Sequence, residues 1–324
     1  MKSRSFDVVR AAMLFPTFEV LEKSGVSVNR LLNSNGFRAF QFRDPCATVP
    51  YPLVSELWDR ILRTEGVEVI EVISRAYSKD RIPGWGAAIL SHPTVLAALK
   101  AGASPSRRTF SSWRAGLELR DADAVYTSRI NLNSRDRVWE AAIAIRLTLD
   151  TFRAGGQEDW MPTKIDLPLN VPSMIDGLFD FEAVDVRFGQ DAMRLYFDPI
   201  ILGEKLRDKG EQDASSFGVP DLTSAKIFDL LQSLKPDCRP SIEVIAESFE
   251  VSPRTIERRL EQENTTFRGV LKTWRTGRAL ELLQNSRLSI EEISTILHYS
   301  TASHFHRAFR SWTGMTPGQY RDAM

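Results

Sequence analysis

Hydrophobic residues in the last third of the chain recur every three or four positions, which is the spacing of one face of an α-helix. The pattern is clear over 223–234 and again over 242–249. A further helix is predicted from Pro253, because Ser252 can cap its free N–H groups and proline at the first helical position costs no hydrogen bond. Two short helices joined by such a tight turn are a helix-turn-helix.

The same unit occurs a second time. Residues 242–252 (IEVIAESFEVS) align with 290–300 (IEEISTILHYS) at an offset of 48. In the second helices the offset is 49, so one residue is added in the second turn. Three pairs define this second offset: Ile256 with Phe305, Arg258 with Arg307, and Leu260 with Phe309. Capping boxes are predicted at two helix starts, Ser289 with Glu292 and Thr316 with Gln319.

Between the two units, residues 265–286 keep helical spacing and predict one uninterrupted linker helix. About 19 residues of α-helix span ~28 Å, which is close to the ~34 Å repeat of the major groove on one face of B-DNA. Gly277 lies inside this segment, where glycine weakens a helix by up to ~1 kcal/mol relative to alanine. We therefore expect Gly277 to pack closely against a neighbouring helix.

The first 115 residues are predicted to be mostly helical, with apolar stripes over 53–62 and 94–102 and a further helix over 106–116. From residue 116 onwards apolar and polar residues alternate, which predicts strands. The elements expected there are a hairpin around Asp121–Asp123, a helix over 137–152, strands over 163–169, 182–189 and 192–198 with the last two joined at Gly189 and Gln190, and a closing helix over 199–206.

This order of elements predicts an α+β N-terminal domain, with a helical front half followed by a small helix-packed sheet. It is followed by an all-α C-terminal domain with two helix-turn-helix motifs joined by a linker helix. The clearest shift in composition is the polar stretch 207–221, which is typical of a linker, although a long surface loop would look the same. We predict three parts: an N-terminal domain over 1–206, a linker over 207–222 and a C-terminal domain over 223–324.

Composition narrows the class of protein. The 324 residues are 43% hydrophobic and 26% charged, and 42 Lys and Arg balance 42 Asp and Glu. This is the composition of a globular protein; it excludes a polybasic protein but not a DNA-binding domain. Cys46 and Cys238 each stand alone, which excludes a disulfide framework and a zinc finger. No stretch of ~18 apolar residues predicts a membrane span, so a cytoplasmic protein without membrane contact is expected.

Residues 225–324 resemble the DNA-binding domain of the AraC/XylS family of bacterial transcription regulators. The most specific part of the resemblance is FHRAFRSWTGMTPGQYR at 305–321. Further matching residues are Ala246, Ser252, Arg254, Thr255, Arg258, Arg259, Leu260, Phe267, Arg275, Ala279, Leu283 and Ile293. The resemblance implies a sequence-specific DNA-binding transcription regulator that works with RNA polymerase, usually as an activator.

The chain departs from the family pattern at three places. His298 stands where a glycine is usual, and Asn264-Thr265 replaces the usual glycine before the linker helix. Both are turn positions and leave the fold unaffected. Glu257 occupies a position often held by Gln, and this change bears on base preference.

The N-terminal part resembles the sensor domain, labelled arabinose-binding-like, of one branch of the same family. The resemblance rests on 6–32, on WMPTKIDLP at 160–168 and on FEAVDVRFGQDAMRLYFD at 181–198. The long helical stretch before residue 116 argues against the β-barrel sensor of the arabinose regulator itself. The ligand named in the domain label therefore implies nothing about this chain, and no effector-binding residue is assigned.

Base-reading side chains are expected on the N-terminal part of each second helix, away from its apolar face. The base-reading candidates are Arg254, Glu257 and Arg258 in the first unit and Ser303, His304 and Arg307 in the second. Arginine can make a bidentate contact to guanine, and Glu257 can accept from cytosine N4 or repel phosphate. The candidates for phosphate contacts, which fix register without reading sequence, are Thr255, His306 and Arg310, with Arg254 as a further one.

The same residues, and a few others, have alternative interpretations. The arginines could instead line a solvated face with ion pairs to Glu261 or Glu263. A metal site at His304 and His306 lacks a third ligand, and no metal or cofactor is expected. The remaining chemical candidates are GWGAAI at 84–89 as a phosphate loop, Cys46 as a nucleophile, and Trp85, Trp113, Trp139 and Trp160 as a pocket lining rather than core aromatics.

We therefore expect a DNA-binding regulator and not an enzyme. Double-stranded DNA is the expected partner, and the N-terminal domain is expected to bind a small-molecule effector or to form a homodimer. One alternative keeps the DNA binding and makes the N-terminal domain a protein-interaction module without a small ligand. Another is an enzyme tethered to DNA that depends on Cys46.

Overall fold

The structure is a computed structural model with two compact units. It describes residues 6–33, 36–78, 81–82, 89–102, 111, 113–120, 122–129, 138–169, 181, 183–206 and 219–323. The C-terminal unit comprises residues 222–323 together with 36–41, and the N-terminal unit comprises the described residues of 6–33 and 42–221. Most of the expected linker, 207–218, lies outside the described residues.

A five-stranded sheet of order β3-β4-β7-β5-β6 forms one half of the N-terminal unit. Its strands are β3 (Arg114–Leu119), β4 (Ala124–Arg129), β5 (Lys164–Asp166), β6 (Asp185–Arg187) and β7 (Met193–Phe197). The predicted hairpin is present, since β3 and β4 pair antiparallel with Gly116 opposite Thr127.

The strands expected to be joined at Gly189 and Gln190 are not neighbours in the sheet. β6 pairs in parallel with β5, and β5 lies between β6 and β7. The reason is visible in the connection, where the N–H groups of Gly189 and Gln190 donate to the carbonyl oxygens of Leu169 and Leu167. The connecting residues therefore bond to the chain after β5 and do not close a hairpin.

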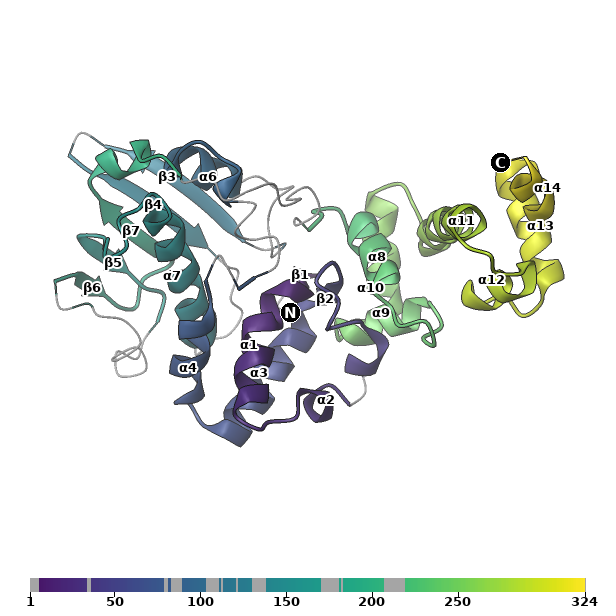
Figure 1. The fold of residues 1–324 in the computed structure, drawn as a ribbon, viewed down its shortest axis with the longest axis horizontal. Coiled ribbons are helices and arrows are strands. Elements are labelled where there is room, and N and C mark those ends of the chain that lie inside the picture. Colours follow the sequence, from purple (N-terminus) through teal and green to yellow (C-terminus); the bar gives the residue numbers. More distant parts are fainter. Residues whose placement is uncertain are drawn as a thin grey trace. The chain divides into compact units, whose positions relative to one another are not determined.

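Helices make up most of the rest of the N-terminal unit (Figure 1). They are α1 (Phe15–Lys23), α2 (Val28–Leu31), α3 (Tyr51–Glu65), α4 (Val69–Ala76), α6 (Val95–Gly102) and α7 (Val138–Arg153), with 3-10 turns at Ala11–Leu14 and Pro199–Gly203. A further 3-10 turn, Phe37–Ala39, belongs to the C-terminal unit. The apolar stripes predicted over 53–62 and 94–102 fall in α3 and α6. The predicted closing helix is only the 3-10 turn at Pro199–Gly203.

Two further expectations for the front half differ from the structure. A two-stranded antiparallel sheet, β1 (Val8–Arg10) with β2 (Thr48–Pro50), was not predicted. Each strand has three residues, too few to show an alternating pattern. The end of the helix predicted over 106–116 is wrong, because Arg114 to Gly116 belong to β3; residues 106–110 and 112 lie outside the described part.

Aromatic side chains on α7 join the helices to the sheet. Phe152 packs against Phe197 of β7, with ring centroids 4.8 Å apart, and stacks on Trp160 at 4.5 Å. At the other end of α7, Trp139 stacks on Trp58 of α3 at 4.7 Å. All of these rings except that of the half-buried Trp160 are core residues, in keeping with the burial of α7 along most of its length.

Seven helices form the C-terminal unit over residues 222–323. They are α8 (Thr223–Gln232), α9 (Ile242–Ser248), α10 (Pro253–Gln262), α11 (Phe267–Asn285), α12 (Ile290–Ile296), α13 (Ala302–Thr313) and α14 (Pro317–Asp322). α11 is the predicted linker helix of 19 residues. It contacts α8 and α10, the second helix of the first helix-turn-helix, and also α12 and α14, of which α12 is the first helix of the second helix-turn-helix (Figure 1).

The predicted helix starts carry the predicted caps. Ser252 accepts a hydrogen bond from the N–H of Thr255 at the start of α10. Both capping boxes are complete, because the side chains of Glu292 and Gln319 accept a hydrogen bond from the backbone N–H of their cap residues. Because each cap side chain satisfies N–H groups that have no partner within the helix, these residues define where the helices begin.

A short segment from early in the sequence belongs to the C-terminal unit. Within 36–41, Phe40 forms an antiparallel bridge with Leu234 just after α8. The N–H of Gln41 donates to the carbonyl of Ser233 at 2.9 Å, and its side-chain amide donates to the carbonyl of Leu234 at 2.9 Å. We call residues 36–41 the clip.

The clip carries two buried aromatic rings in addition to its hydrogen bonds to the C-terminal unit. Phe37 and Phe40 are both 0% exposed, and the N–H of Lys235 donates to the carbonyl of Ala39 at 2.8 Å. The sequence placed this stretch inside the N-terminal domain of 1–206. A pairing across almost 200 residues leaves no local pattern by which it could have been predicted.

The start of α8 is capped by a carboxylate from another helix. Leu222 cannot cap, and Glu263 at the end of α10 accepts from the N–H of Thr223 at 2.6 Å and from that of Ser224 at 2.9 Å. Burial raises the pKa of Glu263, but these hydrogen bonds outweigh it and bring the pKa below the ordinary 4.5. This contact ties α8 to the first helix-turn-helix unit.

We expect Glu263→Gln to lower the free energy of unfolding by about 1 kcal/mol at pH 7, as for the loss of other helix caps. A carboxyl group with a depressed folded-state pKa stabilises above its unfolded pKa and loses this effect as pH falls through the folded value. The deficit should therefore shrink below about pH 4.5. Urea unfolding at several pH values measures it, with the exposed Glu261→Gln as control. An equal deficit at all pH values would contradict the cap.

Gly277 does not pack as expected. It is exposed, and a Cβ built on it has no atom within 4 Å. We expect Gly277→Ala to stabilise the C-terminal unit by about 0.5–1 kcal/mol, because alanine loses less backbone entropy in a helix. Denaturant unfolding of the full chain measures this. The matched control is Gly314→Ala, which should destabilise because Gly314 ends α13 with φ of 80°. Destabilisation by Gly277→Ala would contradict the open environment.

Candidate nucleic-acid interface

The second helix of the first unit, α10, has one buried and one exposed face. Ile256 and Leu260 are both 0% exposed and hold the helix against the unit. The three predicted base-reading residues of this helix are all exposed: Arg254, Glu257 and Arg258. Because the helix starts at Pro253, they lie in its first two turns, the part that reaches base edges in helix-turn-helix proteins.

α13 has the same construction in the second unit. Phe305 and Phe309 are 0% exposed and lie in a core with Ile293 and Leu297 of the preceding helix. The three predicted base-reading residues of this helix are also exposed: Ser303, His304 and Arg307. The structure therefore places three exposed candidates at the start of each second helix.

The exposed arginines of α10 and α13 form no ion pair with another described residue. Among the described residues, no salt bridge involves Arg254, Arg258, Arg307 or Arg310. The alternative partner Glu263 is occupied with the N–H groups at the start of α8. The positive charges of Arg254, Arg258, Arg307 and Arg310 are therefore available to a negatively charged ligand.

The candidates for phosphate contacts differ in exposure. Arg310 is exposed, whereas Thr255 and His306 are half-buried. The hydroxyl of Thr255 lies 3.0 Å from that of Ser252, its helix cap. Of these residues only Arg310 combines charge with full exposure.

Three turn residues adopt the left-handed conformation that favours glycine. They are Glu250, Asn264 and His298, with φ of 52°, 53° and 58°. Each follows the end of a helix, at the position where glycine commonly terminates one. The family pattern has glycine at two of these places because glycine adopts this conformation without strain. Asn264 and His298 adopt the same conformation, so the turns are kept.

The helix caps locate the residue added to the second unit. Ser241 and Ser289 cap the two first helices, at an offset of 48, and Glu250 and His298 occupy the left-handed turn positions at the same offset. The caps of the second helices are Ser252 and Thr301, at an offset of 49. The addition therefore lies between His298 and Thr301.

Contacts from α11 and α14 support the second unit. The sequence named Arg275 and Arg321 as residues of the family resemblance but did not predict what they contact. The guanidinium of Arg275 on α11 lies 4.7 Å from the ring centroid of Tyr299 in the turn. Arg321 donates to the carbonyl of Leu288 at 2.8 Å. The burial of Tyr299 was not signalled by any helical pattern, since it lies in a turn.

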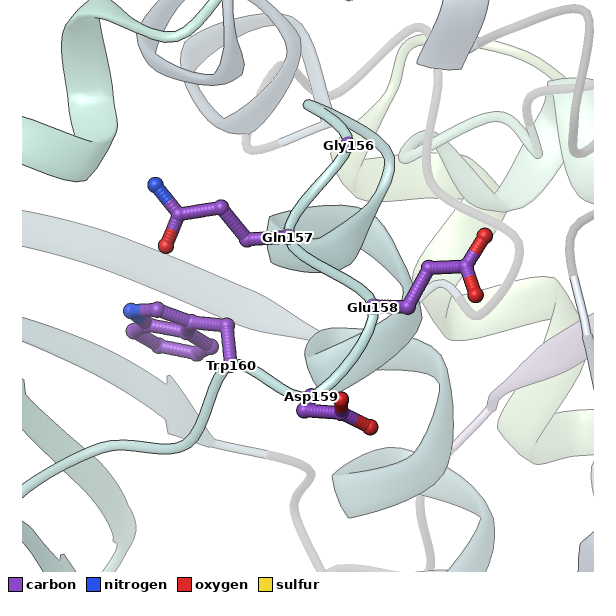
Figure 2. A pocket seen from close by; sticks show the side chains of 5 residues that line it. All are labelled: Gly156, Gln157, Glu158, Asp159 and Trp160. Carbon is purple, nitrogen blue, oxygen red and sulfur yellow. The ribbon is translucent and has the colours of Figure 1, made fainter.

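The described residues of the N-terminal unit show no comparable cluster of candidate residues. An open hollow of about 550 Å³ is lined by the contiguous residues 156–160. Figure 2 shows Gln157 and Trp160 pointing to one side of this loop, and Glu158 and Asp159 pointing to the other. Trp160 is half-buried, stacking on Phe152 while lining this hollow, whereas Trp139 is a buried core residue.

The other chemical candidates make ordinary structural contacts where the structure describes them. Trp113 donates from Nε1 to the hydroxyl of Ser128. Cys46 is exposed, and its backbone bonds to Asp44 and Arg10. No group of three metal-binding side chains occurs within the described part of the chain. Trp85 and most of the glycine-rich run at 84–89 lie outside it. No helix in the described segments has both the length and the apolar character to span a bilayer.

Comparison with known proteins matches both parts of the chain. Residues 245–323 match the helix-turn-helix domain family. Residues 25–206, more than half of the chain, match the arabinose-binding domain of AraC transcription regulators.

Three relatives illustrate the similarity. The HTH-type transcriptional regulator VqsM of Pseudomonas aeruginosa is 39% identical over 88 residues, which cover 27% of each chain. An uncharacterised HTH-type transcriptional regulator of Mycobacterium bovis is 38% identical over 151 residues, which cover 42% of each chain. The HTH-type transcriptional activator CfaD of Escherichia coli is 42% identical over 77 residues, which cover 24% of this chain and 29% of CfaD.

The matched regions thus span less than half the length of these relatives. The family assignment rests on the match to the sensor domain, which is specific to one family, together with the helix-turn-helix match and the paired architecture of α9–α10 and α12–α13. The chain belongs to the AraC family of transcription regulators.

Proposed function

We propose that the C-terminal unit binds double-stranded DNA with α10 and α13 in consecutive major grooves on one face of the duplex. The observation that carries the proposal is the pair of like-built helices, each with exposed candidates at its start, on either side of one continuous helix. At 1.5 Å per residue α11 spans ~28 Å, which is comparable to the ~34 Å groove repeat.

The roles of the individual residues follow from side-chain chemistry. Arg258 and Arg307 occupy equivalent places in the two units and would each contact guanine, whose O6 and N7 match the two donors of a guanidinium. Arg254, Ser303 and His304 would complete the base-reading set. Glu257 would accept from cytosine N4 and disfavour other bases by repulsion.

The phosphate contacts would come from Thr255, His306 and Arg310. Phosphate contacts set register on the duplex and give most of the affinity, whereas base contacts give the specificity. The exposure of Arg310 and the absence of an ion pair for it among the described residues support its place in this group.

We further propose that the N-terminal unit controls this binding. The support is the sensor-domain match over 25–206. A small-molecule effector that binds one arrangement of the protein better than another would shift the population of the DNA-competent state. Homodimerisation through the same unit, contact with RNA polymerase, activation of transcription and action in the cytoplasm complete the proposal, which includes no catalytic step.

We expect Arg258→Ala and Arg307→Ala to relax sequence preference at two separate base pairs, about one helical turn apart. Each loss should be ~1–3 kcal/mol against the preferred base. The measurement starts with selection of a site from a random duplex library by the full chain. Binding to every single-base variant of that site then gives the preference at each position.

Arg310→Ala is the matched control, because a phosphate contact should weaken binding on all sequences alike and reduce the salt dependence of affinity. If Arg258→Ala and Arg307→Ala also weaken binding uniformly, their assignment as base readers is wrong. If the full chain selects no sequence at all, the proposed function itself fails.

We expect a small molecule to raise the unfolding temperature of the full chain. A ligand at 100 times its dissociation constant adds ~2.7 kcal/mol to the free energy of unfolding. A thermal-shift screen of sugars, amino acids and fatty acids measures this, and the Arg258→Ala variant should shift equally because the arginine lies in the other unit. The absence of any shift would favour an N-terminal unit that binds a protein and not a small ligand.

A further inference from the structure

The ring of His304 is held in place by a residue outside its helix. Nδ1 of His304 lies 2.8 Å from the hydroxyl oxygen of Ser300, and both residues are exposed. The backbone N–H of His304 donates to the hydroxyl of Thr301, the cap of α13, at 3.2 Å. Backbone and ring are thus fixed by two consecutive residues of the turn.

The first unit has no counterpart of this contact. Ser300 lies in the part of the turn where the second unit carries its added residue, directly before the cap Thr301. The residue before the cap of α10 is Val251, which has no hydroxyl group. At the place equivalent to His304, α10 has Thr255, whose hydroxyl contacts its own cap Ser252 at 3.0 Å.

We propose that Ser300 is a positioning residue that orients His304 to recognise guanine in the major groove. With Nδ1 turned back toward the hydroxyl of Ser300, the other ring nitrogen, Nε2, faces away from the turn. This inference rests on the proposed function, because it requires α13 to enter the groove. It assigns to the longer turn of the second unit a role in sequence specificity.

The proposal also assigns the tautomer of the ring. A hydroxyl can donate or accept; in the arrangement that we propose, Ser300 donates to Nδ1, which leaves the ring proton on Nε2 as a donor toward the DNA. A donor placed between guanine N7 and O6 finds an acceptor on either side, whereas adenine presents an amino group beside N7, thymine presents O4 alone and cytosine presents only an amino group. Arg307, one turn further along the helix, is exposed on the same helix and reads a neighbouring position.

The experiment compares Ser300→Ala, Ser300→Thr and the control Ser311→Ala in the full chain. Ser311 is an exposed serine at the other end of α13. The probe is the selected site and its single-base variants, including 7-deazaguanine, which lacks only the N7 acceptor. We expect wild type, Ser300→Thr and Ser311→Ala to prefer guanine at one position by about fivefold to tenfold. The Ser300→Ala variant should lose this preference and should keep the separate preference for guanine that Arg258 confers.

His304→Ala should lose the same preference, and adding Ser300→Ala to it should cost nothing more. In wild-type protein without DNA, nitrogen NMR of His304 should report a bare Nδ1 and a protonated Nε2. Uniform weakening by Ser300→Ala on all sequences would indicate a phosphate contact and overturn the proposal, as would an unchanged preference. A wild-type chain with no preference at any position would instead refute the proposed DNA readout, while the NMR result still decides the hydrogen bond.

Discussion

The separation of the two helix-turn-helix units depends on the continuity of one helix. α11 runs unbroken for 19 residues and contacts helices of both units. A continuous helix fixes both the distance and the rotation between its two ends, since each residue adds 1.5 Å and 100°. The register of α11 therefore sets both the distance between α10 and α13 and the direction in which each presents its exposed face. A coil of the same length would fix neither.

The two units share a framework and differ at the surface that it presents. Ile256 and Leu260 in the first unit correspond to Phe305 and Phe309 in the second, and all four are fully buried. The residues outside this apolar face are different, since Glu257 in the first unit corresponds to His306 in the second, and Thr255 corresponds to His304. A duplicated scaffold with unlike exposed residues suits the recognition of two different half-sites by one chain.

The clip gives the N-terminal chain a second connection to the C-terminal unit, in addition to the segment before α8. Its hydrogen bonds to Ser233 and Lys235 lie at the end of α8, and Glu263 holds the start of the same helix. α8 is thus held at one end by a piece of the early sequence and at the other by α10 of the first unit. The clip therefore holds the end of α8, a helix that contacts α11.

Several features of this protein were predictable from local sequence. The helices of the C-terminal unit follow from apolar spacing and from cap residues such as Ser252, Ser289 and Thr316, because capping is a contact between residues three apart. The exposure of Arg258 and Arg307 follows from the same periodicity. In the N-terminal unit the β3–β4 hairpin and the long helix α7 were predicted for the same reason.

The tertiary structure decided everything that depends on residues distant in the chain. The place of β5 between β6 and β7, the cap that Glu263 provides for α8 and the clip at 36–41 all join segments whose pairing leaves no periodic signal. Gly277 was misread because a glycine in a helix looks the same whether a neighbour is close or absent. Local hydrogen bonds and apolar spacing involve residues close together in the sequence, whereas the pairing of distant segments is determined only when the whole chain packs.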